Sequence, residues 1–344
     1  MIFPGAGVFI LRSRLAQRFA SAICCTLLVT GGTPATAQTT TQAAVQTFPN
    51  KPIRFVVPTA VGGNADIVAR IAAEGMSRGL GQQVFVDNQA GGRQIPGGLA
   101  VTRATPDGYT LLAVGLAFTA NAVLYNDLPY DSVRDLAPVG VVGSTPLLVV
   151  THPGLPVNNM KELIALAKAK PGTINYASAG VGSPAHLGGE LLNSMAGIKL
   201  VHVPYKGTAQ ANTDTMTGLV QVSLPAAASL LSFVRSGKLR ALGIGSLKRS
   251  PQMSDIPTVA ETLPGYEVQL WNGIETTAGV PKPVIARLNA ELNKGLNTPD
   301  IHARLEKIGV DIAPQTPEEM GSYIDAEIRK WTKVTREAGI RGER

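Results

Sequence analysis

Short apolar runs alternate with amphipathic stretches along most of the chain, which predicts strands alternating with helices. The first run, 52–57, is nearly continuous in apolar residues and ends at Pro58, as expected for a buried strand. Residues 65–79 follow with apolar positions at helical spacing. The order then continues as strand 83–87, glycine-rich loop 88–98, helix 99–104 and strand 110–114. This order indicates an α/β fold with a mostly parallel sheet covered by helices on both faces.

The rest of the chain repeats the alternation and ends in helices. Strands are expected at 145–151, 175–177, 199–203, 220–224, 239–244, 271–277 and 310–312, and helices at 158–169 (capped by Asn158), 185–196, 209–217, 226–236, 281–296 and 300–308 and after a capping box at Thr316. Residues 138–144 and 271–277 are interpreted as two crossings between lobes. The expected organisation is therefore lobe 1 at 50–143 plus 265–344, lobe 2 at 144–264, and a ligand cleft between them.

Residues 175–187, NYASAGVGSPAHL, have the pattern of a strand, a glycine turn and a helix start. Gly180 and Gly182 permit positive φ angles, and Ser183 stands at the N-cap position before Pro184. Such a turn directs free backbone N–H groups and the positive end of a helix dipole at one point. With the hydroxyls of Ser178 and Ser183 as further donors, it is a candidate anion site.

A second turn of this kind comes earlier in the chain, at Thr59-Ala60-Val61-Gly62-Gly63-Asn64. Asn64 is expected to cap the following helix, and Asp66 falls in its first turn. Asp66 either occupies the helix end for structural reasons or orients a water or an amine on the ligand. Two opposed turns across a cleft favour a receptor for a small carboxylate.

Residues 1–37 have the features of a signal peptide. Arg12, Arg14 and Arg18 form a basic region, 19–29 an apolar region, and 35–37 an A-x-A cleavage site. An uncleaved anchor is the alternative. Both cysteines, Cys24 and Cys25, belong to this segment, so the mature protein is expected in the periplasm without disulfides, after a flexible spacer at 38–49.

Composition and charge narrow the function further. The chain of 344 residues is 44% hydrophobic, enough for a large core. Loss of the three signal-peptide arginines lowers the formal net charge from +7 to +4. No Lys/Arg-rich run is present, which argues against nucleic-acid binding. No later apolar run approaches the ~20 residues of a membrane span.

Residues 175–187 are called the focal turn below, and the helix that follows is called the focal helix. Two enzyme classes fit parts of the focal turn. Residues 180–185 match the dinucleotide fingerprint G-x-G-x-x-G/A, but the following strand ends His202-Val203-Pro204 without the acid that holds a ribose. A serine hydrolase would use Ser183, yet Pro184 lacks the N–H that an oxyanion hole needs there. The four histidines lack metal-ligand spacing, so neither a metal nor a cofactor is expected.

Each of the other candidate site residues has two possible roles. His186, in the first turn of the focal helix, either faces the ligand or makes a structural hydrogen bond. Tyr205-Lys206-Gly207 follows a strand and lies either on the cleft rim or in a surface turn. Trp271 either lines the cleft or packs at the crossing.

Several long motifs, in order, resemble the solute receptors of tripartite tricarboxylate transporters, the TctC or Bug receptors. They are IRFVVPTAVGGNADIVAR, TPDGYTLL, LPYDSVRDLAPV, ELIALAKAKPGTINYASAGVGSPAHLGGEL, HVPYKGTAQA, GKLRALGIGS, IPTVAE and Trp271-Asn272-Gly273. The resemblance runs from about Phe48 to the C-terminus.

The resemblance implies a type II periplasmic binding-protein fold, a monomeric receptor without enzymatic activity, and delivery of the ligand to large and small permease subunits. It maps ligand contacts onto Thr59 to Asp66 and onto Ser178, Gly180, Gly182 and Ser183, and less directly onto His186 and 205–207. Ala226 matches a position that varies with ligand. There are two departures from the family pattern. Val61, in place of a proline, sits beside the pocket and leaves the exact ligand open; residues 88–91, NQAG in place of NRPG, lack a basic residue for which Arg93 is a partial replacement. The sequence leaves dicarboxylates, tricarboxylates, amino acids and aromatic acids open as ligands.

Overall fold

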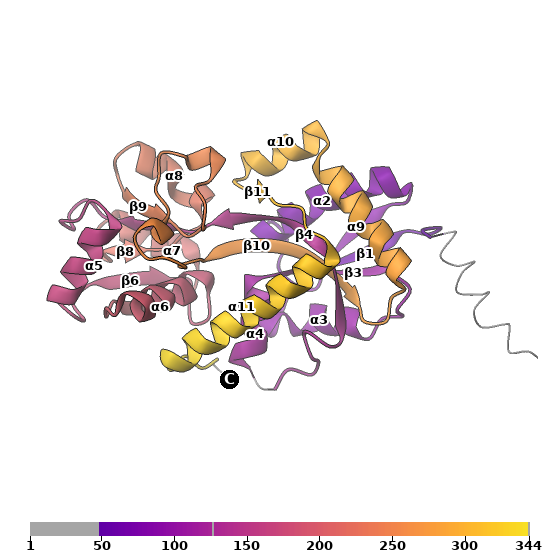
Figure 1. Cartoon of the computed structure of the whole chain (residues 1–344), viewed down its shortest axis with the longest axis horizontal. Helices are drawn as coiled ribbons and strands as arrows, with labels where there is room; N and C mark the ends of the chain where they lie inside the picture. Colours follow the sequence, from indigo (N-terminus) through magenta and orange to yellow (C-terminus); the bar gives the residue numbers. More distant parts are fainter. Residues whose placement is uncertain (1–47, 126, 343–344) are drawn as a thin grey trace, which may run out of the picture. The chain divides into compact units, whose positions relative to one another are not determined.

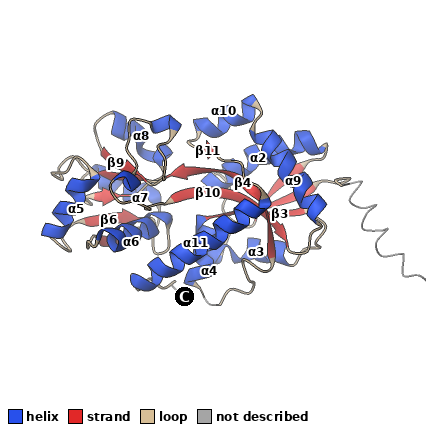
Figure 2. Cartoon of the chain, in the orientation of Figure 1, coloured by secondary structure: helices blue, strands red, loops and turns tan. Residues whose placement is uncertain are grey.

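Two β-sheets organise the chain in the computed structural model, which describes residues 48–125 and 127–342 (Figures 1 and 2). The predicted signal peptide, its cysteines and most of the spacer lie outside the described residues. The first sheet has the strand order β11-β4-β10-β3-β1-β2. Its strands are β1 (Ile53–Val57), β2 (Val84–Asn88), β3 (Thr110–Gly115), β4 (Leu136–Pro146), β10 (Gln269–Thr277) and β11 (Asp311–Ile312).

Strand direction divides this sheet in half. β1 runs parallel to β2 and β3, as the β-α-β-α-β order predicts. β10 is antiparallel to both β3 and β4, and β11 is antiparallel to β4. The expectation of a mostly parallel sheet therefore holds only for the N-terminal half, because the returning strand β10 enters from the opposite direction.

Helices cover both faces of the first sheet. They are α2 (Asn64–Leu80), η1 (Gly92–Gln94), α3 (Ile95–Thr102), α4 (Leu116–Leu124), α9 (Lys282–Leu296), α10 (Pro299–Lys307) and α11 (Pro317–Glu337). Side chains of α2, α9 and α10 share one buried cluster with Ile53, Phe55 and Val57 of β1. Val56 points to the other face, into a cluster that includes residues of α3, α4 and α11. This alternation along β1 explains why its apolar run is continuous: both faces are buried.

The second sheet has the order β7-β6-β8-β5-β9. Its strands are β5 (Leu148–Thr151), β6 (Asn175–Ser178), β7 (Val201–Pro204), β8 (Val222–Ser223) and β9 (Arg240–Ile244); its helices are α5 (Met160–Ala169), α6 (Pro184–Ala196), α7 (Thr208–Met216), α8 (Ala227–Arg235), η2 (Pro251–Met253) and η3 (Val259–Glu261). β6 is parallel to β7 and β8, and β5 is antiparallel to β8 and β9. The two sheets with their helices form two α/β lobes, which confirms the predicted fold class.

The chain passes between the lobes twice, beside Gly245. β4 of the first sheet ends at Pro146 and β5 of the second begins at Leu148, so the expected crossing at 138–144 is in fact the body of a strand. The return enters β10 from Val268. Gly245 N–H donates to Leu147 O at 2.7 Å, and Val268 N–H donates to Gly245 O at 2.8 Å. One residue thus ties both crossings together.

Several predicted helix boundaries need correction. Gly63, not Asn64, is the N-cap of α2, and Asn64 is its first residue. Asn159, not Asn158, caps α5, while the backbone and side chain of Asn158 donate to Glu162 instead. α3 begins at Ile95, four residues before the predicted start, and α4 was not predicted at all.

Candidate functional site

A cavity of about 330 Å³ lies where the start of α2 meets the strand ends of the second sheet. Its lining is Asn64, Leu147, Ala177, Ser178, Ala179, Ser183, Pro184, Ala185, Thr208, Ala211, Asn212, Ser223, Leu224, Pro225, Ala226, Ser229 and Leu270. Asn64 belongs to α2 and Leu270 to β10, and the other lining residues belong to the second lobe or to the crossing. The cavity therefore joins both lobes.

Four helices begin at this cavity. Asn64 is the first residue of α2, Ser183 is the N-cap of α6, Thr208 is the first residue of α7, and Ala226 is the N-cap of α8. Helix N-termini expose N–H donors and carry partial positive charge, so four together favour an anion.

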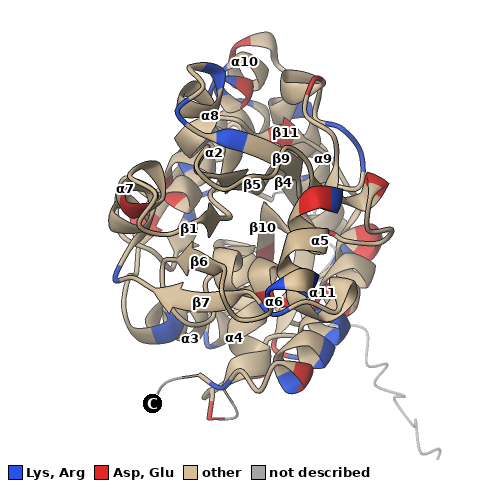
Figure 3. Cartoon of the chain, turned by 90° about the vertical axis from the view of Figure 1, so that its left-hand side faces the viewer, with Lys and Arg blue, Asp and Glu red and all other residues tan. Residues whose placement is uncertain are grey.

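The described lining residues include no Asp, Glu, Lys, Arg or His. Figure 3 places Lys, Arg, Asp and Glu mainly on helices and loops, and strands β6 and β7 carry none of them. An anion in the cavity would be held by backbone donors, hydroxyls and amides. A cation would find no carboxylate there to balance its charge.

The focal turn has the predicted backbone geometry. Gly180 and Gly182 have φ angles of 119° and 75°. Ser183 caps α6 by accepting a hydrogen bond from the N–H of His186, and Pro184 opens the helix. Ser178 and Ser183 both line the cavity, as the sequence predicts.

The N–H groups of this turn are less free than expected. Gly180 N–H donates to Ser178 Oγ at 3.1 Å, and Gly182 N–H donates to His186 Nδ1 at 3.0 Å. Ser183 N–H donates to Gly180 O at 3.2 Å. The expectation that Gly180 and Gly182 present free donors is therefore wrong, because side chains within four residues take those donors. Neither glycine lines the cavity.

Of the two roles considered for His186, facing the ligand or making a structural hydrogen bond, the structure supports the second. Its side chain is 6% exposed and lies outside the cavity lining. Its ring stacks on that of His202, whose Nε2 lies 2.6 Å from Ser178 Oγ. Burial lowers the pKa of His186 to about 4, so the ring is neutral and Nδ1 is available as an acceptor for Gly182.

The loop at 59–64 before α2, called the first turn below, is anchored by Asp66. This carboxylate is 2% exposed and accepts hydrogen bonds from Gly62 N–H at 2.8 Å, from Arg70 Nε at 3.1 Å and from Asn88 Nδ2 at 2.9 Å. Although burial raises the pKa of Asp66, these hydrogen bonds bring it below its ordinary value. The side chain thus fixes the turn rather than facing the cavity.

The rest of the first turn contributes its backbone. Gly63 gives α2 no side-chain cap, so the first N–H groups of the helix are not covered by its N-cap residue. Ala60 O accepts from Gly63 N–H, and Thr59 O accepts from Asn88 Nδ2. Among the predicted residues of this turn, the structure brings only Asn64 to the cavity.

The 205–207 turn lies beside the site. Tyr205 hydroxyl donates to Asp214 at 2.8 Å, and Gly207 is the N-cap of α7. None of Tyr205, Lys206 and Gly207 lines the cavity, whereas the next residue, Thr208, does.

Several lining residues were missed from the sequence. The polar ones are Thr208, Asn212, Ser223 and Ser229. The spacing of Thr208 and Asn212, four residues apart on α7, puts both on one helix face and is a signal that could have been used. Ser223 gives no such signal, because its position depends on the order of strands in the sheet.

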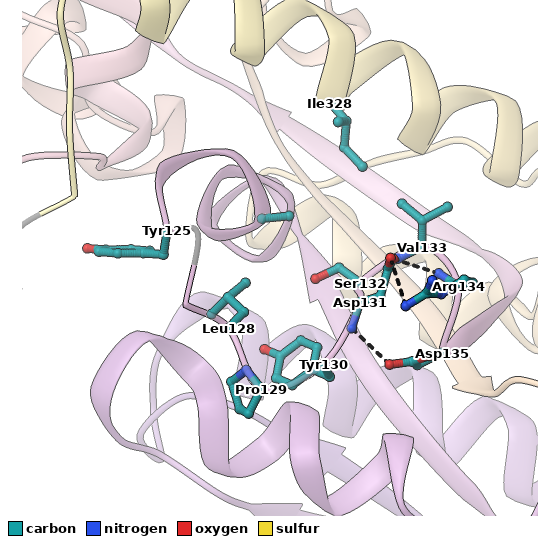
Figure 4. A pocket seen from close by; sticks show the side chains of 11 residues that line it. Tyr125, Leu128, Pro129, Tyr130, Asp131, Ser132, Val133, Arg134, Asp135 and Ile328 are labelled. Atoms are coloured by element: carbon teal, nitrogen blue, oxygen red, sulfur yellow. Dashed lines mark hydrogen bonds and ion pairs between the residues drawn. The ribbon is translucent and has the colours of Figure 1, made fainter.

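Three larger hollows lie elsewhere and do not contain the predicted site. One, of about 620 Å³, lies beside Ile328 of α11 (Figure 4). It is lined by Asp131 and Asp135, and Asp131 pairs with Arg134. Arg134 also lines this hollow, so its lining carries one more carboxylate than cation, which does not favour a carboxylate ligand. The second, of about 920 Å³, is lined by Arg93, which pairs with Asp127. The third, of about 430 Å³, lies beside α8 and β9 and has Arg240 and Asp255 in its lining.

No group of three or more His, Cys, Asp or Glu that could hold a metal ion occurs in residues 48–125 and 127–342. Within the same ranges, no helix has the length and apolar character required to cross a membrane.

Two α/β lobes joined by two crossings, with an uncharged cavity at several helix starts, define a solute-binding receptor. The chain belongs to the TctC family, described as the tripartite tricarboxylate transporter family receptors, whose model matches residues 68–340. This is a receptor family and not a family of enzymes, so the hydrolase and dinucleotide readings are set aside.

Known proteins agree with this assignment. Protein BugT of Bordetella pertussis (strain Tohama I) is 35% identical over 324 residues, which cover 92% of this chain and 98% of BugT. The structure of R. palustris Rpa4515 with adipate is 31% identical, with a TM-score of 0.72, and covers 86% of this chain and 99% of that one. The periplasmic binding protein BugD is 33% identical, with a TM-score of 0.69, 86% coverage of this chain and 100% of its own.

Proposed function

We propose that this protein is a periplasmic receptor that captures a small organic carboxylate by lobe closure and delivers it to a tripartite tricarboxylate-type membrane transporter. The observation that carries the proposal is the uncharged cavity at the starts of α2, α6, α7 and α8. Rpa4515, a similar protein, is described with the dicarboxylate adipate, which supports a carboxylate as the ligand.

Closure follows from how the donors are divided. α2 belongs to the first lobe and α6 to the second, so a carboxylate gains all of its hydrogen bonds only when both helix starts reach it. The ligand then shifts the population toward the closed form by its differential affinity for that form. The lobes in this proposal are 50–143 with 265–344, and 144–264.

The proposed contacts fall into two groups. Asn64, Ser178, Ser183 and Ala226 line the cavity and would contact the ligand. The remaining predicted residues would shape and position the turns around it: Thr59, Ala60, Gly62, Gly63, Asp66, Gly180, Gly182, His186, Tyr205, Lys206 and Gly207.

Export and delivery complete the proposal. The signal peptide would be removed near Ala37, and the mature monomer would meet the large and small permease subunits at the membrane. Similarity to the periplasmic binding protein BugD supports this location.

Binding is tested on the mature chain from residue 38 onward. Native mass spectrometry of the purified protein identifies any ligand that co-purifies, and titration calorimetry then measures a panel of mono-, di- and aromatic carboxylates. We expect at least one of them to bind. If none binds across the panel, the receptor proposal fails.

A variant pair links binding to the focal turn. Ser183→Ala removes a hydroxyl from the cavity and should weaken binding by roughly 1–3 kcal/mol. Ser194→Ala removes a hydroxyl from the far end of the same helix, where it donates to Glu337, and should leave affinity unchanged. Equal affinity of the two variants would remove Ser183 from the site.

A further inference from the structure

A side-chain contact joins the two lobes away from the cavity. Asp311 of β11, in the first lobe, accepts hydrogen bonds from Ser250 Oγ at 3.1 Å and from Gln252 Nε2 at 3.3 Å, both in the second lobe. The two donors share one carboxylate oxygen, Oδ1. Figure 1 shows β11 on the side of the first lobe that faces the second. These three residues are called the interlobe clasp below.

The interlobe clasp lies close to the two crossings. Asp311 pairs with Ser144 near the end of β4, the strand that leads into the first crossing. Ser250 comes shortly after Gly245, whose backbone bonds to both crossings. Because side-chain hydrogen bonds do not extend beyond about 3.5 Å, a small rotation of one lobe about the crossings is enough to break the clasp.

Each end of the interlobe clasp is fastened to its own lobe. In the second lobe, the guanidinium of Arg249 donates to both carboxylate oxygens of Glu261, at 2.8 and 2.9 Å, and to Ser254 O at 3.0 Å. In the first lobe, Val310 is fully buried and its N–H donates to Leu305 O at 3.0 Å. Neither end can follow the opposite lobe, so the clasp has to open when the lobes turn apart.

The carboxylate of Asp311 depends on the second lobe for its hydrogen bonds. It is half-buried and forms no ion pair in residues 48–125 and 127–342. Burial raises the pKa of Asp311, and the charge of Glu306 adds to the rise, whereas the bonds from Ser250 and Gln252 oppose it. Water replaces these donors when the lobes separate, so the clasp contributes the net value of its hydrogen bonds, roughly two- to tenfold in the ratio of the two arrangements.

The interlobe clasp is formed in the arrangement that is suited to binding. In the same structure, Asn64 of the first lobe and Ser183 of the second line one cavity. None of Asp311, Ser250 and Gln252 belongs to that lining. The clasp therefore favours the arrangement in which both helix starts reach a ligand, without touching the ligand itself.

We propose that the interlobe clasp is a conformational device that holds the lobes in the binding-competent arrangement and so adjusts ligand affinity from outside the cavity. Its effect on affinity rests on the proposed function, whereas its effect on the separation of the lobes does not. Apparent affinity is proportional to the fraction of protein in the competent arrangement. Loss of the clasp should therefore weaken every ligand by one common factor.

The separation of the lobes is measured first, without a ligand. The chain from residue 38 onward contains no cysteine, so two can be introduced for nitroxide labels. Val61→Cys and Val181→Cys place the labels on the two lobes, at positions that are 71% and 36% exposed. Asn64 and Ser183 follow these positions closely and line the cavity. Double electron–electron resonance then gives the distribution of distances across the cavity.

Asp311→Ala in the labelled chain removes the acceptor of the interlobe clasp. The ratio of short to long label distances should fall by roughly two- to tenfold. Asp311→Asn keeps an amide oxygen that can accept from Ser250 and Gln252, and should shift the distribution less than Asp311→Ala. Asp325→Ala, which removes an exposed aspartate of α11 in the same lobe, is the control and should leave the distribution unchanged.

Gln252→Ala tests the clasp from the second lobe. Among the described residues, the side chain of Gln252 bonds only to Asp311. This variant should shift the distribution in the same direction as Asp311→Ala, but less, because Ser250 still donates. The double variant should shift it no further than Asp311→Ala alone. Melting temperatures identify the folded variants, and if Asp311→Ala does not fold, Gln252→Ala and Asp311→Asn decide the proposal.

The outcomes separate the clasp from the proposed function. If folded Asp311→Ala or Gln252→Ala gives the same distances as Asp325→Ala, or if the effects of the two substitutions simply add, the clasp is refuted while the receptor stands. Titration calorimetry with the panel of mono-, di- and aromatic carboxylates should show affinity falling with the short-distance fraction. An affinity loss that differs between acids would also refute the clasp. If no acid binds, the receptor proposal fails and the distances alone decide the clasp.

Discussion

The imidazole rings of His186 and His202 are stacked in the second lobe, with centroids 3.8 Å apart and planes inclined by 12°. Each ring also bonds to the focal turn. His186 Nδ1 accepts from Gly182 N–H at 3.0 Å, and His202 Nε2 lies 2.6 Å from Ser178 Oγ. The pair therefore connects the shape of the turn to the protonation state of two buried rings.

The buried histidine pair predicts that the folded protein loses stability at acidic pH. Burial lowers the pKa of each ring to about 4, and the charge of His186 lowers that of His202 further. An unfolded chain would protonate them near pH 6.5 and so binds more protons between pH 4 and 6.5. The free energy of unfolding should therefore be highest above this window and fall as the pH decreases through it, by at most about 1.4 kcal/mol per pH unit per histidine.

Urea unfolding between about pH 5 and 7.5 measures this slope. His202→Gln should make the pH dependence of the free energy of unfolding shallower, by up to the contribution of one histidine, about 1.4 kcal/mol per pH unit. His302→Gln, which changes a histidine on α10 that lies outside the stacked pair, is the control. A slope that is the same in all three proteins would contradict a role for the buried pair.

Two glycines set the distance between α2 and α9. A Cβ on Gly295 would lie 2.7 Å from the carbonyl carbon of Gly75. Because this carbon belongs to the backbone of α2, no side-chain rotation can relieve the contact. Gly295→Ala should gain up to about 1 kcal/mol of helix propensity but lose roughly 1–3 kcal/mol as the helices are forced apart. We expect net destabilisation in chemical unfolding.

Gly321→Ala is the matched control for this prediction. Gly321 is also inside a helix, α11, but its added Cβ would meet only Pro138 Cγ at 3.6 Å, an ordinary contact. The substitution should be neutral or stabilising, by up to about 1 kcal/mol. If both variants shift stability in the same direction, close packing of α2 on α9 is not the reason that position 295 is glycine.

Local chemistry was readable from the sequence where a few neighbouring residues decide the structure. The capping box of α11 forms as predicted, with Thr316 and Glu319 each bonded to the other's backbone N–H. The start of α6 at Pro184 follows in the same way from the residues beside it. The two-lobe α/β architecture also followed, because apolar runs and helical periodicity recur along the whole chain.

What depends on distant packing was not readable. Ser223 reaches the cavity only because β8 lies between β6 and β5 in the sheet. The donors of Gly180 and Gly182 were expected to be free, but rotamers of Ser178 and His186 decide otherwise. The one-residue errors at Asn64 and Asn158 have a simpler cause: in each case the neighbouring residue is also an acceptable N-cap.

The capping box itself gives a prediction. Thr316→Ala removes the hydroxyl that accepts from Glu319 N–H and should lower the free energy of unfolding by about 0.5–2 kcal/mol. Ser322→Ala, on the same helix, removes an exposed hydroxyl that donates to Glu318 O and should change stability by less than about 0.5 kcal/mol. Equal effects in urea unfolding would mean that the cap does not hold the start of α11.

A substitution at Asp66 tests whether its carboxylate holds the shape of the first turn or contacts the ligand directly. Asp66→Asn keeps the size of the side chain but cannot accept from Gly62, Arg70 and Asn88 together. Because the carboxylate is buried, the loss should cost roughly 1–3 kcal/mol of stability. Binding should weaken only as far as the turn that carries Gly62 loses its shape.

Glu74→Gln provides the comparison for Asp66→Asn. Glu74 is on the same helix and pairs with Arg78 and Arg304, but all three side chains are exposed, so its loss should cost less than about 1 kcal/mol. Chemical unfolding and carboxylate titration are measured on both variants. A loss of affinity in Asp66→Asn with unchanged stability and an unchanged backbone around Gly62, seen by crystallography, would mean that the carboxylate acts on the ligand directly.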